Sequence, residues 1–171
     1  ICACLVGSEM CIRDRYNTAE FLACVERLRR YFPGCALTAD MITGFPGETE
    51  ADQAAAVAFL EQVGFAAVHV FPYSRRPGTK ADAMPEQLSH AVKSARAHEA
   101  QRVADACKQR YLVQQVGQTL PVLFETEHDG SWVGHSDNYC LVRAAGDDLR
   151  GLVKNVKISA VSGQMLVGDL V

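Results

Sequence analysis

TADMITGFPGETEAD (residues 38–52) is the stretch of sequence that most restricts the fold. Its first residues belong to a short, mostly apolar run over residues 35–43, which is typical of a buried parallel strand. A turn with Gly44 and Gly47 follows, and the Thr-x-x-Asp signature at 49–52 predicts the start of a helix. In parallel α/β folds, ligands bind where the carboxyl ends of strands enter such turns. The stretch therefore predicts a ligand-binding turn, and the alternative is a turn that only requires glycine for its backbone shape.

The same alternation of elements extends on both sides of this stretch. Asn17 has the position of an N-cap, and apolar residues at helical spacing predict a helix from there to residue 32. A second helix is predicted to end at Gly64, and residues 66–71 predict a second buried strand in which His69 is a hydrogen-bonded structural residue. The order helix, strand, helix, strand, with short links, is typical of an α/β sheet or barrel.

The remaining sequence predicts three further segments. Residues 72–84 form a polar loop, and residues 85–116 predict one long helix, or two helices with a bend. Short apolar runs separated by glycines from Gly117 onward predict about five strands, which fit a small barrel of OB-like size. The basic residues of the long helix are predicted to lie on a solvated face, and they are Lys93, Arg96, Arg102, Lys108 and Arg110.

Composition excludes several classes of protein. The chain has 171 residues, of which 49% are hydrophobic and 22% charged, so wholesale disorder is excluded. The net charge of -3 excludes a strongly basic nucleic-acid coat but leaves a local RNA site open. No apolar run approaches the ~20 residues that span a bilayer. An odd number of cysteines without a C-x-x-C pair favours a reduced cytoplasm and scattered core thiols over a metal site built from distant ones; they are Cys2, Cys4, Cys11, Cys24, Cys35, Cys107 and Cys140.

Two further stretches contain residue types that bind nucleic acid. In VFPYSRRPGT (70–79), Tyr73 is suited to stacking on a base and the arginines to binding phosphates, although a solvated loop explains the same residues. In GSWVGHSDNYCLV (130–142), the side chains suited to stacking on RNA bases are Trp132, His135 and Tyr139. The alternative for the tryptophan is a place in the barrel core. No Ser/His/Asp or Cys/His set with a fixed spacing emerges, so no hydrolase is predicted.

Together these segments resemble one protein family. DMITGFPGETEAD (40–52), VFPYSRRPGTKA (70–81) and the strands after Gly117 are similar, in this order, to the C-terminal half of radical-SAM methylthiotransferases. The last part resembles their TRAM domain. Members of the family modify isopentenyladenosine in tRNA, threonylcarbamoyladenosine in tRNA, or an aspartate of a ribosomal protein. The chain most resembles the threonylcarbamoyladenosine type, and the ribosomal-protein type usually has acidic residues where Arg75 and Arg76 stand.

The resemblance implies a division of the chain into four parts. Residues 15–84 would be the last β/α units of a partial TIM-like radical-SAM barrel, residues 85–116 a linker helix, and residues 117–171 a TRAM-like RNA-binding domain. Residues 1–14 are expected to be a non-native tail. The C-x-x-x-C-x-x-C motif of the radical-SAM cluster is absent. The chain is therefore expected to contain no catalytic residue and no metal ligand, and to be an inactive fragment of an enzyme.

For the parent enzyme, the resemblance implies S-adenosylmethionine and two [4Fe–4S] clusters as cofactors. The expected partner is the tRNA anticodon arm, rather than DNA or a membrane, and the expected product carries a methylthio group at carbon 2 of the adenosine next to the anticodon. Residues expected to line the S-adenosylmethionine site are Ile42, Gly44, Gly47, Glu48, Val70, Phe71 and Tyr73. Residues expected to bind RNA are Arg75, Arg76, Trp132, His135 and Tyr139. Two alternatives stay open: a stand-alone RNA-binding module without catalysis, and a fragment of a ribosomal-protein methylthiotransferase.

Overall fold

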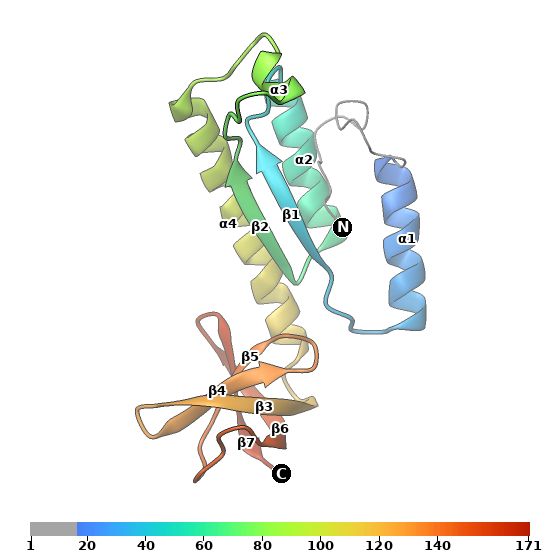
Figure 1. Cartoon of the computed structure of the whole chain (residues 1–171). Coiled ribbons are helices and arrows are strands. Elements are labelled where there is room, and N and C mark those ends of the chain that lie inside the picture. Colours follow the sequence, from blue (N-terminus) through green and yellow to red (C-terminus); the bar gives the residue numbers. More distant parts are fainter. Residues whose placement is uncertain (1–16) are drawn as a thin grey trace. The chain divides into compact units, whose positions relative to one another are not determined.

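The computed structural model describes residues 17–171, which divide after Cys107 into two compact units, one mixed α/β and one all-β (Figure 1). The predicted tail lies outside the described residues, as do Cys2, Cys4 and Cys11. The division falls inside a helix, upstream of Gly117. Among the described residues, no helix has the length and apolarity that crossing a membrane requires.

The α/β unit confirms the predicted order of helix, strand, helix and strand. Its two strands are parallel, and they pair from Thr38 opposite Ala67 to Thr43 opposite Pro72. The helix α4 begins in this unit and continues beyond Cys107. The elements in chain order are α1 (Thr18–Tyr31), β1 (Thr38–Thr43), α2 (Glu50–Val63), β2 (Ala67–Pro72), α3 (Lys80–Ala83) and α4 (His90–Gln114).

Both predicted helix starts are confirmed as capping boxes. The Asn17 side chain accepts a hydrogen bond from the Glu20 backbone N–H at 3.0 Å, and the Glu20 carboxylate accepts one from the Asn17 N–H at 2.9 Å. Thr49 and Asp52 exchange the same pair of bonds, and the hydrogen bonds from Thr49 lower the pKa of Asp52. An N-cap contributes about 1 kcal/mol to helix stability. The second box fixes the start of α2 directly after the glycine-containing turn.

Among the described residues, the sheet is covered on one face only. Ala39 and Met41 of β1 belong to a hydrophobic core that includes residues of α2 and α4. The opposite face contains His69, which is exposed, and Phe71, which is 52% exposed. The predicted burial of the second strand, with His69 as an internal hydrogen-bonded residue, is therefore wrong. An apolar run does not distinguish a strand covered on two faces from a strand covered on one.

The segment before α4 differs from the predicted loop and helix. Residues Lys80–Ala83 form the short helix α3, and α4 begins at His90 rather than near Pro85. Glu86 has a φ of 60°, which is a left-handed conformation that interrupts a helix. The Glu86 carbonyl accepts a hydrogen bond from the Gly47 N–H at 3.2 Å. This bend therefore contacts the turn that follows β1.

The all-β unit is a closed barrel with the strand order β3-β4-β5-β7-β6. Neighbouring strands pair antiparallel, except β5 and β7, which are parallel. Phe124 and Val142 are completely buried inside it, and Trp132 is 7% exposed. The structure confirms the prediction of about five strands in this region, and they are β3 (Thr119–His128), β4 (Ser131–Ser136), β5 (Leu141–Ala144), β6 (Val153–Ser162) and β7 (Met165–Leu170).

The cysteines within the described residues are free thiols. Cys107 and Cys140 are buried, as predicted for core residues, whereas Cys35 is half-buried and Cys24 is exposed. Burial raises the pKa of the Cys140 thiol, which keeps it protonated and unreactive. Over residues 17–171, no three His, Cys, Asp or Glu side chains are grouped so that they could hold a metal ion.

Candidate functional site

The GFPGE loop (residues 44–48) joins the carboxyl end of β1 to the start of α2. The Gly44 N–H donates to both carboxylate oxygens of Glu48, at 3.0 and 2.9 Å. The Glu48 N–H donates to the Phe45 carbonyl at 3.0 Å, which closes the loop on itself. The Tyr73 N–H donates to the Thr43 carbonyl at 2.8 Å. The segment that leaves β2 is therefore hydrogen-bonded to the last residue of β1 at the carboxyl edge of the sheet.

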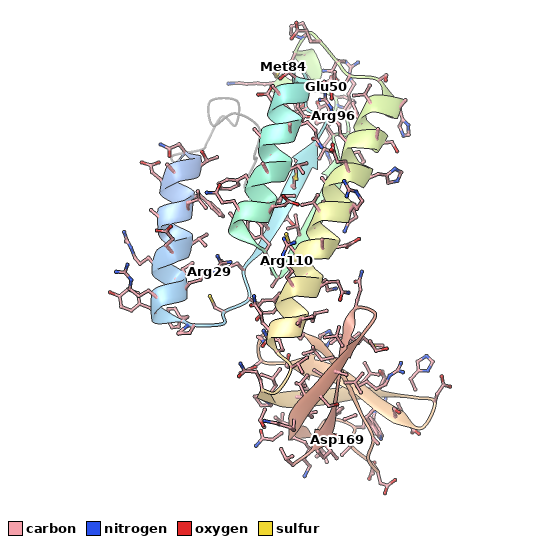
Figure 2. All side chains as sticks on the ribbon, turned by 180° about the vertical axis from the view of Figure 1, so that it is seen from behind. Arg29, Glu50, Met84, Arg96, Arg110 and Asp169 are labelled. Atoms are coloured by element: carbon pink, nitrogen blue, oxygen red, sulfur yellow. The ribbon has the colours of Figure 1, made fainter. Side chains whose placement is uncertain are left out.

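Arg96 of α4 binds this loop from the other side. Its Nη1 donates to the Glu48 carbonyl at 2.9 Å and to Glu48 Oε1 at 2.6 Å, and its Nη2 donates to Glu50 Oε1 at 2.6 Å. Figure 2 shows Arg96 directed from α4 toward Glu50 at the start of α2. Arg96 is 6% exposed, so the prediction that it lies on a solvated face is wrong. Burial favours a lower pKa, but the hydrogen bonds to Glu50 and Glu48 prevail and hold the pKa of Arg96 above its ordinary value.

Lys93, one turn before Arg96, packs directly over Gly44. A Cβ atom on Gly44 would lie 2.6 Å from Lys93 Cγ and 3.1 Å from Lys93 Cα, and Gly44 has a φ of +71°. Both the space and the backbone conformation therefore require glycine at this position. The Lys93 ammonium lies 4.9 Å from the centre of the Tyr73 ring, and the Tyr73 ring meets Phe45 edge-on at 5.2 Å.

Carboxylates dominate the charge at this edge. Glu48 is buried, and Glu50 and Asp52 occupy the first turn of α2, where a free helix N-terminus would attract an anion. Arg96 is the partner of the first two. Three carboxylates beside one guanidinium leave the start of the helix with a net negative charge, which favours a positively charged ligand and disfavours a phosphate there.

The residues predicted to line a cofactor site fall into two groups. Ile42 and Phe71 are register partners on the open face of the sheet, whereas Val70 packs against the core. Gly44 and Glu48 are buried, and Gly47, with a φ of +80°, and Tyr73 are half-buried. Both oxygens of Glu48 are occupied by Gly44 and Arg96. Glu48 therefore shapes the loop and has no oxygen directed to a ligand.

Two hydroxyl groups at this edge have no hydrogen-bond partner among the described residues. They are Thr43 Oγ1, at the end of β1, and the Tyr73 hydroxyl, just after β2, and both atoms are buried. A buried hydroxyl without a partner costs about 1–3 kcal/mol. An unpaired hydroxyl at the carboxyl edge of the sheet is a group whose hydrogen-bonding capacity a polar ligand would satisfy. The two hydroxyls are consistent with an organic cofactor that has its own donors and acceptors.

The two arginines predicted to bind RNA differ in their surroundings. Arg75 donates to the Asp82 carboxylate at 2.8 Å and to the Asp82 carbonyl at 3.0 Å. Arg76 is exposed on the same loop. Arg75 already has an anionic partner, so Arg76 is the better candidate for a phosphate contact.

The barrel surface brings two of its three predicted RNA residues together. Tyr139 is 84% exposed, and its ring centre lies 5.4 Å from that of His135. His135 Nδ1 lies 2.6 Å from Glu125 Oε2, which orients the imidazole. Trp132 is buried, so its ring is not accessible for stacking in this structure.

Two exposed apolar residues beside this pair were not predicted as site residues from the sequence. Leu123 is the register partner of His135 on one side and of Val153 on the other, and both apolar side chains are exposed. The alternation of Leu120, Val122 and Phe124 along β3 places Leu123 on the outer face, so the signal was present. An exposed row of side chains therefore crosses three strands of the barrel, and it consists of His135, Tyr139, Leu123 and Val153.

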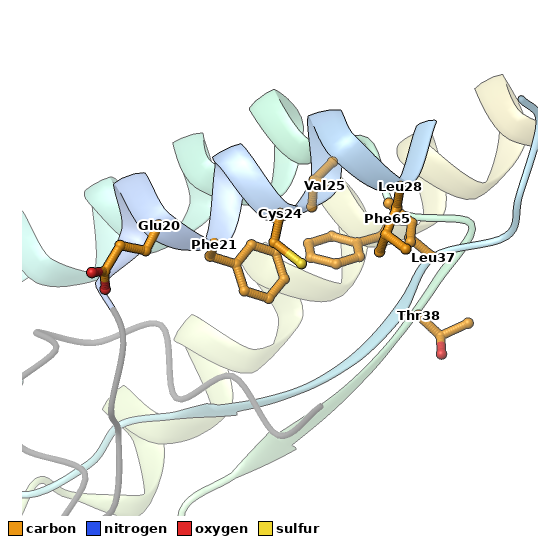
Figure 3. A pocket seen from close by; sticks show the side chains of 8 residues that line it. All are labelled: Glu20, Phe21, Cys24, Val25, Leu28, Leu37, Thr38 and Phe65. Atoms are coloured by element: carbon orange, nitrogen blue, oxygen red, sulfur yellow. The ribbon is translucent and has the colours of Figure 1, made fainter. Parts of the chain in front are cut away.

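An apolar pocket of about 320 Å³ lies between α1 and the start of β1, and the sequence did not predict it (Figure 3). Phe21, Cys24 and Val25 of α1 form one side, and Leu37 and Phe65 contribute to the other. Polar groups are few at its wall, so the pocket offers no chemistry of its own.

Comparison with known proteins identifies relatives over most of the chain. No family model matches it. The chain is 35% identical over 153 residues to the threonylcarbamoyladenosine tRNA methylthiotransferase MtaB of Bacillus subtilis. The aligned region covers 86% of this chain and 34% of that protein. It is 39% identical over 170 residues to the tRNA-2-methylthio-N(6)-dimethylallyladenosine synthase of Maricaulis maris, with 96% of this chain and 37% of the relative covered. The synthase of the same name from Nitratidesulfovibrio vulgaris is 36% identical over 164 residues, which are 91% of this chain and 36% of the relative.

The α/β unit and the barrel thus both have counterparts in tRNA-modifying enzymes. Over the shared length, the chain belongs to the methylthiotransferase family, which confirms the family that its motifs indicated. The chain spans about a third of the length of the curated relatives that it matches. Relatives named for two different modified adenosines match at comparable identity, so overall similarity does not separate the two substrate types.

Proposed function

We propose that the chain is the C-terminal part of a radical-SAM enzyme that adds a methylthio group to carbon 2 of threonylcarbamoyladenosine next to the anticodon of tRNA. In this proposal, residues 15–84 are the last units of a partial TIM-like barrel, residues 85–116 are a linker helix, and residues 117–171 are a TRAM domain. The main support is the similarity to methylthiotransferases across both units. Without the cluster motif, the chain by itself is inactive.

The cofactor part of the proposal rests on the carboxyl edge of the sheet. S-adenosylmethionine, when bound, supplies the radical chemistry and the methyl group, together with two iron–sulfur clusters whose ligands this chain lacks. Gly44 and Gly47 allow the backbone to approach the cofactor, and Thr43 Oγ1 and the Tyr73 hydroxyl supply hydrogen bonds. The carboxylates at the start of α2 favour a ligand with a positive sulfonium centre over a phosphate.

The test of this function uses the full-length gene that encodes the chain. Cells that lack their own methylthiotransferase are complemented with it, and their tRNA is digested and analysed by nucleoside mass spectrometry. We expect the methylthio derivative of threonylcarbamoyladenosine. Methylthiolated isopentenyladenosine would show that the proposed nucleoside is wrong and that the family is right. A modified ribosomal protein with unmodified tRNA would show that the substrate is not RNA.

RNA binding by the barrel has a separate test on the chain itself. Replacing Tyr139 with alanine removes an exposed ring that is proposed to stack on a base, and one such stack contributes about 1–3 kcal/mol. Anisotropy titrations with a fluorescent anticodon stem-loop are expected to show a matching loss of affinity. Tyr31→Ala, which removes another exposed tyrosine on α1, is the control and is expected to bind as the original chain does. Equal affinities for both variants would remove Tyr139 from the RNA surface.

A further inference from the structure

Arg96 connects α4 to Glu48, the last residue of the GFPGE loop, and through it to Gly44, the first. Its Nη1 donates to Glu48 Oε1 at 2.6 Å, and the same carboxylate accepts the Gly44 N–H through both of its oxygens. The Glu48 side chain is completely buried in this arrangement. A chain of hydrogen bonds therefore runs from α4, through a buried carboxylate, to the backbone at the end of β1.

We infer that Arg96 is a positioning residue for the cofactor: it holds Glu48, and Glu48 holds Gly44 and the adjoining backbone in the conformation that approaches the cofactor. The inference rests on the proposed function, because it gives Arg96 a part in binding S-adenosylmethionine. Arg96 is buried behind the loop, so it acts through Glu48 and does not touch the cofactor.

The physical basis is the cost of an unpaired buried carboxylate. Without Arg96, the buried charge of Glu48 is no longer compensated, and its side chain turns toward water. This change removes the acceptor of the Gly44 N–H. Lysine is an incomplete substitute, because its single nitrogen cannot bind the Glu48 carbonyl, the Glu48 carboxylate and Glu50 in the geometry of a guanidinium.

A second contact holds the backbone of α4 beside the loop independently of the Arg96 side chain. Gln53 of α2 donates through its Nε2 to the Arg96 carbonyl at 3.2 Å and to Glu99 Oε2 at 3.1 Å, and Gln53 is buried. These bonds remain when only the Arg96 side chain is replaced. The helix then stays in place, and the loop is the part that changes conformation.

The experiment compares Arg96→Met with Glu50→Gln in the whole chain. Glu50 is the exposed end of the cluster, with 88% of its side chain accessible, so its neutralisation leaves the Arg96–Glu48 contact intact. Amide hydrogen exchange is followed by NMR at Gly44 and at Met41, a buried residue of β1. For Arg96→Met we expect exchange at Gly44 to accelerate about tenfold more than at Met41, because the loop opens locally. Glu50→Gln is expected to match the original chain at both amides.

Equal acceleration at both amides would indicate general destabilisation and overturn the inference, as would an unchanged rate at Gly44. Arg96→Lys retains the charge and is the second variant if Arg96→Met does not fold. It is expected to accelerate Gly44 selectively, to a smaller extent. An unchanged Gly44 amide in Arg96→Lys would also overturn the inference.

S-adenosylmethionine binding to the same variants, measured by titration calorimetry, separates this inference from the proposed function. The original chain is expected to bind the cofactor, and Arg96→Met to bind about tenfold more weakly, because the loop is no longer preorganised. Absence of binding to the original chain would overturn the proposed cofactor site, while the exchange rates would still report whether Arg96 holds the loop. Equal affinities of the original chain and Arg96→Met would overturn the positioning role alone.

Discussion

Gly134→Ala is expected to destabilise the barrel by about 3–5 kcal/mol, which is enough to unfold a marginally stable small domain. A Cβ atom at this position would lie 2.0 Å from the Leu123 carbonyl oxygen and 2.7 Å from Phe124 Cα. Both are backbone atoms of β3, so the added methyl group cannot be accommodated by turning a side chain. The β3–β4 pairing must separate, and this pairing is part of the closed barrel.

Urea unfolding followed by tryptophan fluorescence measures this effect directly. The chain contains one tryptophan, Trp132, and it is buried in the barrel. The matched control is Gly130→Ala in the turn of the same hairpin, where φ is +72° and no atom lies within 4 Å of an added Cβ. This control is expected to lose only about 1–2 kcal/mol, from backbone strain. Similar unfolding midpoints for the two variants would contradict the steric argument.

Gly44→Ala is expected to destabilise the α/β unit by about 2–4 kcal/mol and to distort the GFPGE loop. The strain of a left-handed φ of +71° is one part of the loss, and the contact with Lys93 at 2.6 Å is the other. The control variant Gly34→Ala measures the loss from backbone strain alone. Gly34 has a φ of +80° in the same unit and nothing within 4 Å of an added Cβ, so only the backbone strain applies there.

A double-mutant cycle with Lys93→Ala measures the contact itself. Lys93→Ala removes Cγ, the nearest atom to the added methyl group, but leaves the backbone of α4 unchanged. The Gly44→Ala change is therefore expected to be less destabilising in the Lys93→Ala background, and the stabilities are compared by urea unfolding followed by far-UV circular dichroism. Additive losses would mean that Lys93 does not restrict the loop.

Local signals in the sequence were sufficient to predict where the first two helices begin and which segments form strands. Asn17 and Thr49 each have an acidic residue three positions later, and both form capping boxes, because the two partners lie within one helical turn. The alternation along residues 120–124 and the frequent glycines likewise predicted the strands of the barrel. In these cases the residues that determine the structure are close together in the chain.

The errors involve partners that are distant in the chain. Arg96 has the sequence context of a solvated residue, and it is buried because Glu48 lies beside it in the folded unit. His69 is within an apolar run, and it is exposed because the sheet formed by the described strands is covered on one face only. Periodicity reports which residues share a face of an element, but not which element packs on that face. The cofactor-lining and RNA-binding roles remain predictions that the variants above test.

The strand order of the barrel has a consequence for its folding during synthesis on the ribosome. β3, the first strand of the barrel to be made, has β6 as a partner, and β5 and β6 both pair with β7, the last strand. The barrel therefore cannot close until Met165–Leu170 has left the exit tunnel of the ribosome. Until then the nascent barrel presents unpaired strand edges, which bind chaperones or other chains. The pairing of β1 with β2 does not wait in this way, because the two strands are separated only by the helix α2.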